Sequence, residues 1–408
     1  MKIVVLKFGG TSVGSIKKIK KVAEIVSSYK KKNYKVIVVS SAMSGVTNDL
    51  IKKSLEISND FSDSEYDVLV SSGEQVACSL IAGRLIHKGY KSRSWLSWQI
   101  PIITNAVHKN SRINRVNRNK IIKYLKEGGI PIITGFQGVN YYNRITTIGR
   151  GGSDASAIMI AKFFKAEKCI IYTDVEGIYT TDPNKLLKAK KIKVISYEEM
   201  LEMASLGAKV MQPVSIQDAR LNRIDIEVRS SFVNKPGTII TKRSNIINYK
   251  IVTGISSTQN DSKISLIGVK DKPGVAASIF KPLSKNSINV DMVVQNISAN
   301  GKETDLTFTI KTEDLNKTKK IIRENENINF RKLLLKKEVS KISIIGVGMV
   351  TTPGVTFRMF QALASKKINI QVISTSEIKI SVLIDNRDTK KALIALHNEF
   401  KLGISKWA

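Results

Sequence analysis

The chain opens with an apolar strand that ends in a lysine and a pair of glycines. Residues 3–6 are all apolar, Lys7 follows them, and Gly9-Gly10-Thr11 comes next. An apolar run of this kind is typical of a central strand in a parallel sheet. Glycines at the end of such a strand let backbone N–H groups approach an anion, and we expect Ser12 or Ser15 to cap the following helix. The opening therefore predicts a phosphate site, with Lys7 at the carboxyl end of the strand.

Two common nucleotide-binding motifs are excluded by their spacing. The first glycine pair is not followed by the Gly-Lys-Ser/Thr of a P-loop. The second glycine run, Gly149-Arg150-Gly151-Gly152-Ser153-Asp154, carries Asp154 where a dinucleotide fold requires its last glycine. Neither a P-loop fold nor a Rossmann dinucleotide fold is therefore favoured.

Composition limits the class of protein. A chain of 408 residues exceeds the size of a single core, so two or three domains are expected. No run of about eighteen apolar residues is present and the chain enters a strand at once, which predicts a cytoplasmic protein without a membrane segment. Cys78 and Cys169 form no Cys-x-x-Cys pair, and the three histidines are far apart in sequence. Neither a disulfide framework nor a protein-held metal site is predicted.

The formal net charge of +32 raises the question of nucleic-acid binding. The lysines are spread along the whole chain, as an AT-rich coding sequence would produce, and no nucleic-acid-binding motif accompanies them. Arg112, Arg115 and Arg118, spaced at i, i+3, are interpreted as a solvated helix face. Charge alone supports only nonspecific binding, so no nucleic-acid partner is predicted.

The first 245 residues alternate short apolar runs with helical patterns, which indicates an α/β domain with a mostly parallel sheet. The expected strands are 2–8, 35–41, 130–134, 169–173 and 224–229, and the expected helices are 15–32, 66–88, 113–127, 153–165 and 197–206. The polar stretch 242–250, which follows an Asn-Lys-Pro-Gly turn, is the predicted boundary.

Beyond the boundary the sequence repeats itself. Pro273-Gly274-Val275 and its flanking apolar residues recur at Pro353-Gly354-Val355, an offset of 80 positions. Each copy has the pattern strand, Pro-Gly turn, helix, strand, with a further strand (305–311; 378–384) and helix (315–324; 388–399) after it. This is the β-α-β-β-α-β order of a ferredoxin-like domain, a fold that hosts many functions. The predicted domains are 1–245, 252–335 and 336–408.

Taken together, these motifs resemble those of the aspartate kinases, amino-acid kinases that carry two C-terminal ACT domains. The resemblance covers essentially the whole chain and rests on 7–13, 149–154 and 172–183, in that order. It implies a three-layer amino-acid-kinase α/β domain followed by two ferredoxin-like ACT domains. It implies transfer of the γ-phosphoryl group of Mg-ATP to the β-carboxylate of L-aspartate, the first step toward lysine, threonine, methionine and diaminopimelate.

The resemblance also assigns roles to residues. The catalytic candidates are Lys7, Asp154 and Lys209, and Asp154 has the plain alternative of a helix cap. The nucleotide candidates are Lys7, Gly9, Gly10, Thr11, Thr173, Asp174, Tyr179, Lys185 and Lys209. The aspartate candidates are Ser41, Thr47, Glu74, Arg150, Gly151, Gly152 and Ser153; for Ser41 and Thr47 turn and cap chemistry is the alternative. The family commonly has Arg after Asp-Pro, whereas this chain has Asn184, so a phosphate contact there is weakened or taken over by Lys185.

The ACT repeats predict feedback inhibition by an amino acid, lysine or threonine or both. Helix N-termini at the Pro-Gly-Val turns suit a ligand carboxylate, and nearby polar side chains suit its ammonium. The effector candidates are Asp271, Gly274, Val275, Asn289, Asp291, Gln295, Gly354, Val355, Asn369 and Glu377. ACT pairing between subunits implies at least a homodimer, and a shorter regulatory subunit made from a start near Val252 is left open.

Two other functions remain as alternatives. One is that of another member of the amino-acid kinase family, a glutamate, acetylglutamate or uridylate kinase; the ACT repeats, the Ser-Gly-Glu motif around Glu74 and the 149–154 loop oppose it. The other is a non-catalytic amino-acid sensor, which the presence of Lys7, Arg150, Asp154 and Lys209 opposes.

Overall fold

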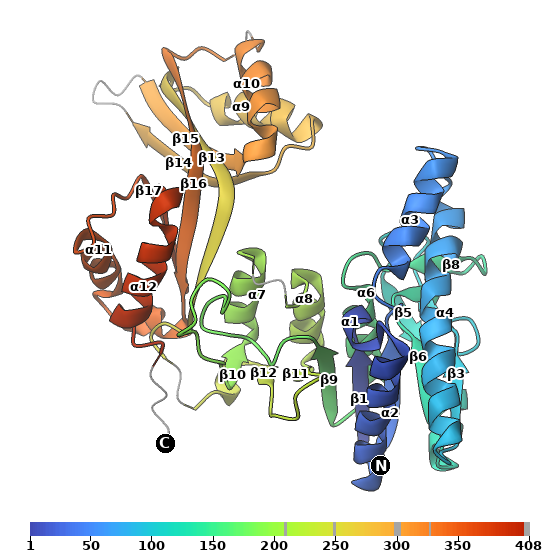
Figure 1. Cartoon of the computed structure of the whole chain (residues 1–408). Coiled ribbons are helices and arrows are strands. Elements are labelled where there is room, and N and C mark those ends of the chain that lie inside the picture. Colours follow the sequence, from blue (N-terminus) through green and yellow to red (C-terminus); the bar gives the residue numbers. More distant parts are fainter. Residues whose placement is uncertain (208–209, 248–249, 298–302, 326–327, 404–408) are drawn as a thin grey trace. The chain divides into compact units, whose positions relative to one another are not determined.

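The computed structural model describes residues 1–207, 210–247, 250–297, 303–325 and 328–403. It divides into two compact units, one of residues 1–179 and 191–248 and the other of residues 180–190 and 249–408. The two units are described separately. Residues 180–190 therefore interrupt the first unit in sequence but pack with the second (Figure 1).

The first unit is built on an eight-stranded sheet with the strand order β10-β12-β11-β9-β1-β2-β6-β3. All neighbouring strands in it are parallel except the pair β11 and β12, which confirms the mostly parallel sheet. The strands are β1 (Ile3–Phe8), β2 (Lys35–Ser40), β3 (Ser92–Trp95), β6 (Ile130–Thr134), β9 (Lys168–Thr173), β10 (Val194–Ser196), β11 (Ile226–Ser230) and β12 (Thr238–Thr241). A smaller four-stranded sheet contains β4 (Ile102–Thr104), β5 (Ile113–Val116), β7 (Gln137–Val139) and β8 (Ile145–Thr147).

Helices cover both faces of the large sheet. Since successive residues of β1 point to opposite faces, neighbouring residues of this strand contact different helices. Leu6 and Phe8 share one core with apolar residues of α2 (Ile16–Lys31) and α4 (Asp63–His87). Lys7 points to the other face, where its ammonium meets α6 (Gly152–Phe163). The remaining helices of this unit are α1 (Gly10–Val13), α3 (Val46–Ile57), α5 (Asn119–Lys126), α7 (Tyr197–Ser205) and α8 (Pro213–Asn222).

The prediction of a helix over residues 113–127 is wrong in its first part. Residues 113–116 form β5, which pairs with β4, and the helix begins only at Asn119. Arg112, Arg115 and Arg118 therefore do not lie on one helix face. Their i, i+3 spacing is overridden by Ile113 and Val116, β-branched residues that favour the pleated strand.

The second unit contains a six-stranded antiparallel sheet with the order β14-β15-β13-β16-β18-β17. Its strands are β13 (Gly254–Lys270), β14 (Val290–Ile297), β15 (Glu303–Lys311), β16 (Lys332–Ile345), β17 (Val372–Ser376) and β18 (Lys379–Asp385). Its helices are α9 (Val275–Lys285), α10 (Leu315–Arg323), α11 (Val355–Ala364) and α12 (Thr389–Glu399). The predicted alternation of strands and helices in each repeat is present.

The two repeats of this unit share their central strands. The C-terminal half of β13 contributes Ile264 and Leu266 to one core, whereas the N-terminal end of the same strand contributes Ile255 to the other core. Ile342 and Ile344 of β16 also belong to that second core. The second repeat therefore includes residues that precede the first repeat in sequence.

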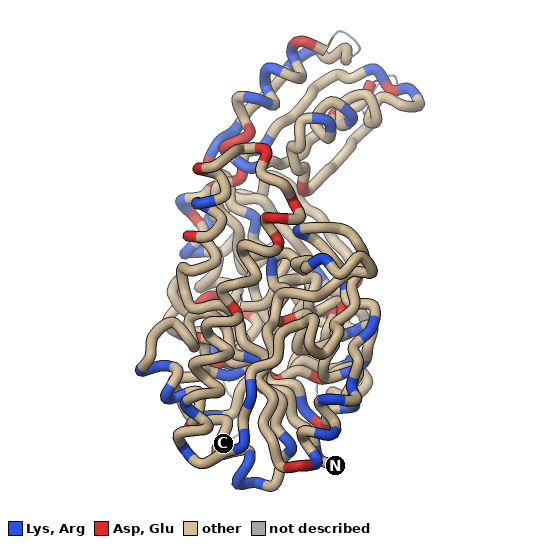
Figure 2. The backbone as a smooth tube through the Cα atoms, turned by 90° about the vertical axis from the view of Figure 1, so that its right-hand side faces the viewer, with Lys and Arg blue, Asp and Glu red and all other residues tan. Residues whose placement is uncertain are grey.

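Among the described residues, no helix is long and apolar enough to span a membrane. Basic side chains are distributed along the traced backbone rather than gathered on one element (Figure 2).

Candidate active site

The carboxyl ends of the central parallel strands meet at one edge of the large sheet. Phe8 is paired with Ser40 of β2 and with Tyr172 of β9, and Thr173 is paired with Ser230 of β11. Several of the predicted site residues follow these strands directly, among them Gly9, Ser41 and Asp174. Loops at the carboxyl ends of parallel strands are where open α/β sheets bind ligands.

The predicted catalytic pair is formed by Lys7 and Asp154. The Lys7 Nζ atom lies 2.5 Å from Asp154 Oδ1, and each side chain is 10% exposed. Asp154 is in the first turn of α6, where it pairs with the strand lysine. A buried ammonium held by a carboxylate has a fixed position, which is what binding of a transferred phosphoryl group requires.

The glycines beside this pair let the backbone pack closely against it. A Cβ atom on Gly9 would lie 3.4 Å from Lys7 Nζ, and one on Gly10 would lie 3.0 Å from the carbonyl oxygen of Ala42, so a side chain at either position would crowd these groups. The Gly9 amide itself donates to the Tyr172 carbonyl at 3.1 Å. Gly10 is followed by Thr11 in the short helix α1, and Ser15 accepts a hydrogen bond from the Lys18 amide, as expected of a cap.

Glu74 presents a buried carboxylate beside the same loops. Its Oε1 atom accepts a hydrogen bond from the Ala42 amide at 3.1 Å, and its Oε2 atom is buried with no hydrogen-bond partner among the described residues. Burial raises the pKa of this carboxyl to about 8, and the Ala42 hydrogen bond opposes the rise. Ser41, which precedes Ala42 in the loop after β2, and Thr47, in the first turn of α3, are partly exposed. An unpaired acceptor of this kind suits the ammonium group of a bound amino acid.

The second glycine loop lies between β8 and α6. Gly151 has φ of +76°, and a Cβ on it would lie 2.7 Å from the Gln212 side chain, so glycine is needed there. Gly152 and Ser153 are buried in the start of α6, whereas Arg150 is exposed. Lys209, which precedes Gln212 in sequence, lies outside the described residues.

The predicted nucleotide loop divides between the two units. Thr173 donates to the exposed Asp174 carboxylate at 3.0 Å, and Tyr179 is partly exposed. Lys185 belongs to the second unit, where its ammonium donates to the Ser257 hydroxyl at 2.9 Å and to the Ser257 carbonyl at 3.2 Å. Burial lowers the pKa of Lys185. A role for Lys185 in phosphate binding stays a prediction.

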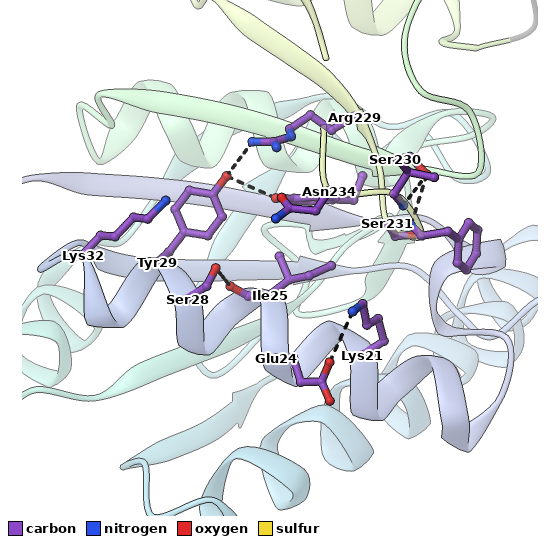
Figure 3. Close-up of a pocket in the computed structure, with 13 residues that line it drawn as sticks. Lys21, Glu24, Ile25, Ser28, Tyr29, Lys32, Arg229, Ser230, Ser231 and Asn234 are labelled. Carbon is purple, nitrogen blue, oxygen red and sulfur yellow. Dashed lines mark hydrogen bonds and ion pairs between the residues drawn. The ribbon is translucent and has the colours of Figure 1, made fainter. Parts of the chain in front are cut away.

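A hollow of about 210 Å³, which no sequence motif predicts, is lined by residues of α2 and of the segment around the end of β11 (Figure 3). It lies between α2 and the loop after β11. The Tyr29 hydroxyl lies 3.1 Å from that of Tyr172 and accepts from Arg229 at 3.3 Å, while Ser231 lies 2.8 Å from Ser12. The Ser231–Ser12 contact therefore links the segment after β11 to α1, the short helix that begins at Gly10.

The predicted effector residues belong to the second unit, and most of them are exposed. Gly274 and Gly354 precede α9 and α11 with φ of +89° and +84°. Gly274 and Val275 line one hollow, and Asn289 lines another. Asp291 forms an ion pair with Lys341 of β16. The other candidates divide into buried Val355 and exposed Asp271, Gln295, Asn369 and Glu377.

Comparisons with known proteins agree with this arrangement. Residues 2–230 match the model of the amino acid kinase family, and residues 264–325 and 342–400 match an ACT domain. The aspartate kinase of Pseudomonas putida is 43% identical over 404 residues, which cover 98% of each chain. Aspartokinase III of E. coli, solved with lysine and aspartate in a T-state, is 25% identical with a TM-score of 0.81, covering 98% of this chain and all (100%) of the other. The same enzyme solved with aspartate and ADP in an R-state has a TM-score of 0.75 at 25% identity, covering 98% of this chain and 99% of the other.

Proposed function

This chain belongs to the amino acid kinase family, among its aspartate kinases, and we propose how its residues perform that reaction. The enzyme transfers the γ-phosphoryl group of ATP to the β-carboxylate of L-aspartate and forms 4-phospho-L-aspartate. The observation that carries the proposal is the buried Lys7–Asp154 pair beside Gly9 and Gly10 at the carboxyl edge of the sheet.

The acceptor is a carboxylate, which is already ionised at neutral pH and needs no general base. The protein must instead place the acceptor in line with the phosphoryl group and stabilise the charge that spreads over its oxygens. Lys7 supplies a fixed positive charge, Lys209 a second one, and Asp154 keeps Lys7 in place. Glu74 receives the substrate ammonium on its unpaired oxygen, and Arg150 receives a carboxylate.

The residues around the pair fit a magnesium ion that arrives with the nucleotide. Among the described residues no cluster of three His, Cys, Asp or Glu side chains is suited to hold a metal ion. Magnesium at such sites is bound chiefly through substrate phosphates with one or two carboxylates. Asp154 is the carboxylate placed to do this, and the ion would neutralise charge on the phosphates.

The second half of the chain is assigned to regulation. We assign 1–245 to the kinase domain and 252–335 and 336–408 to ACT domains, which bind lysine or threonine and pair between at least two subunits. A shorter regulatory subunit starting near Val252 is compatible with this plan. The substrates and product point to the cytoplasm, in the pathway toward lysine, threonine, methionine and diaminopimelate.

A coupled ADP-release assay tests the function. We expect release with L-aspartate and none above background with L-glutamate or without an acceptor. Release with glutamate alone would identify a different amino-acid kinase. Titration of lysine and threonine, singly and together, tests the regulatory assignment, which fails if neither binds nor inhibits the full-length protein.

A further inference from the structure

We infer that Asp67 is a positioning residue of the aspartate site, whose buried carboxylate holds the loop that carries Arg150 at a fixed spacing from Glu74. The inference rests on the proposed function, in which Glu74 and Arg150 bind opposite groups of one small substrate. It concerns a side chain on α4 that neither the motifs nor the relatives' names point to.

Asp67 is completely buried, with none of its surface exposed to solvent. Its Oδ1 atom accepts from the Thr147 hydroxyl at 2.5 Å and from the Lys109 amide at 3.1 Å. Its Oδ2 atom lies 3.2 Å from the same amide and 2.6 Å from His108 Nδ1. A buried carboxylate without partners is costly, so these donors are bound tightly to α4.

The donors come from two segments that flank the loop of residues 149–154, which contains Arg150. One segment contains His108 and Lys109, and the other contains Thr147. Thr147 ends β8, three residues before Arg150. The Thr147 carbonyl accepts from the Ser111 amide at 2.8 Å and from the Ser111 hydroxyl at 3.0 Å. A Cβ on Gly149 would lie 3.1 Å from the Lys109 carbonyl oxygen, so the Lys109 segment packs directly behind the loop. Asp67 thus fixes both the start of the loop and its support.

The same helix carries the other half of the site. Asp67 and Glu74 are seven positions apart on α4, which places them on one face and about 10 Å apart along the axis. Between them the Ser71 carbonyl accepts from Gln137 Nε2 at 2.8 Å, which ties the helix to β7. A helix is stiff over two turns, so the spacing between Glu74 and the Arg150 loop is set by Asp67. A displacement of about 1 Å in such a site is enough to reduce kcat/KM roughly a hundredfold, and a misplaced binding group contributes to that loss by raising KM.

Two kinds of variant test this role in the full-length enzyme. Asp67→Asn keeps the shape but turns one acceptor into a donor that faces other donors. Thr147→Val removes one hydroxyl, and Thr147→Ser restores it. We expect KM for aspartate to rise about tenfold or more in Asp67→Asn and Thr147→Val, KM for ATP to change less than about twofold, and Thr147→Ser to behave like the parent.

Leu85→Ala is the matched control, because Leu85 is fully buried on the same helix and far along it from Asp67. This control should lower the melting temperature and leave KM for aspartate unchanged. If Asp67→Asn behaves like Leu85→Ala, or if Thr147→Val and Thr147→Ser are equal, the positioning role is refuted. If Asp67→Asn does not fold, the positioning role is tested by comparing KM for aspartate between Thr147→Val and Thr147→Ser.

Amide hydrogen exchange separates this inference from the proposed function. In Asp67→Asn or Thr147→Val, amides of 105–111 and 148–152 should exchange at least about tenfold faster, while those of β1 stay protected. Unchanged exchange in these segments overturns the inference even if the parent phosphorylates aspartate. If the parent has no activity with aspartate, the proposed function fails, and exchange still decides whether Asp67 holds the loop.

Discussion

Replacement of Glu74 by Gln should abolish a pH dependence in aspartate binding that the buried carboxylate creates. The pKa of the Glu74 carboxyl is raised to about 8 by burial, so only about a tenth of the free enzyme carries the ionised form at pH 7. The substrate ammonium binds the ionised form. KM for aspartate should therefore rise about tenfold for each pH unit below 8.

Glu74→Gln keeps the acceptor for the Ala42 amide but has no charge to titrate. We expect its KM for aspartate at pH 8.5 to be about 10- to 150-fold above the parent value, because a charged hydrogen bond contributes about 1.5–3 kcal/mol. Between pH 6 and 8 the KM of the variant should be flat. The assay is the coupled ADP-release measurement at saturating ATP, repeated at half-unit pH steps.

Stability of the variant provides the control. The Glu74 carboxyl has an ordinary pKa of 4.5 in the unfolded chain and about 8 in the folded protein, so the free energy of unfolding falls as pH rises through this window. The Gln side chain does not ionise, so the free energy of unfolding of Glu74→Gln does not fall in this way. The variant should be at least as stable as the parent at pH 8. The reasoning is refuted if the parent KM is flat from pH 6 to 8, or if the variant shows the same slope.

Three further predictions concern charge. Lys7→Ala should lower turnover at least about a hundredfold without unfolding, because it removes a charge used in the transition state; unchanged turnover in the purified variant would exclude this role. Arg150→Lys should weaken aspartate recognition by about 1–3 kcal/mol with little effect on ATP, since lysine lacks the bidentate fork; weaker ATP binding in a titration would move the loop to the nucleotide. Despite the net charge of +32, nucleic-acid binding should be nonspecific and fall steeply with salt, which a sequence-selective gel shift at high salt would contradict.

Much of the first unit follows from local sequence signals. β1, β2, β6 and β9 are continuous apolar runs, and such runs can be recognised as buried parallel strands. The lysine and glycines at the end of the first run also indicated that the site lies at the carboxyl ends of the parallel strands. The short strand β5 was missed because Arg112, Arg115 and Arg118 also fit a helix of i, i+3 spacing, and only the pairing of Ile113–Val116 with β4 decides between the two structures.

Tertiary contacts explain what the sequence did not predict. Asp67 lies between apolar residues on a helix, where a carboxylate is uncommon, yet the sequence does not name Thr147, His108 or Lys109 as its partners. Local patterns report which residues are buried but not which distant donors meet them. The same limit applies to Lys185, whose partner Ser257 lies 72 positions away.

The shared strands of the second unit predict which regulatory fragment can fold by itself. Val252 and Ile255 are 2% and 1% exposed and belong to the core that includes Ile342 and Leu393. A fragment of residues 252–408 keeps these side chains, whereas one of residues 259–408 removes them and unpairs the part of β16 that faces 254–258. Loss of large buried aliphatic side chains costs about 2–5 kcal/mol each, a large share of the stability of a small domain.

We therefore expect the longer fragment to unfold cooperatively on heating and the shorter one to lack a cooperative transition, as measured by circular dichroism. A start near Val252 would then yield a folded regulatory subunit, whereas a start after residue 258 would not. Equal stability of the two fragments would show that the first residues of β13 are dispensable to the second repeat.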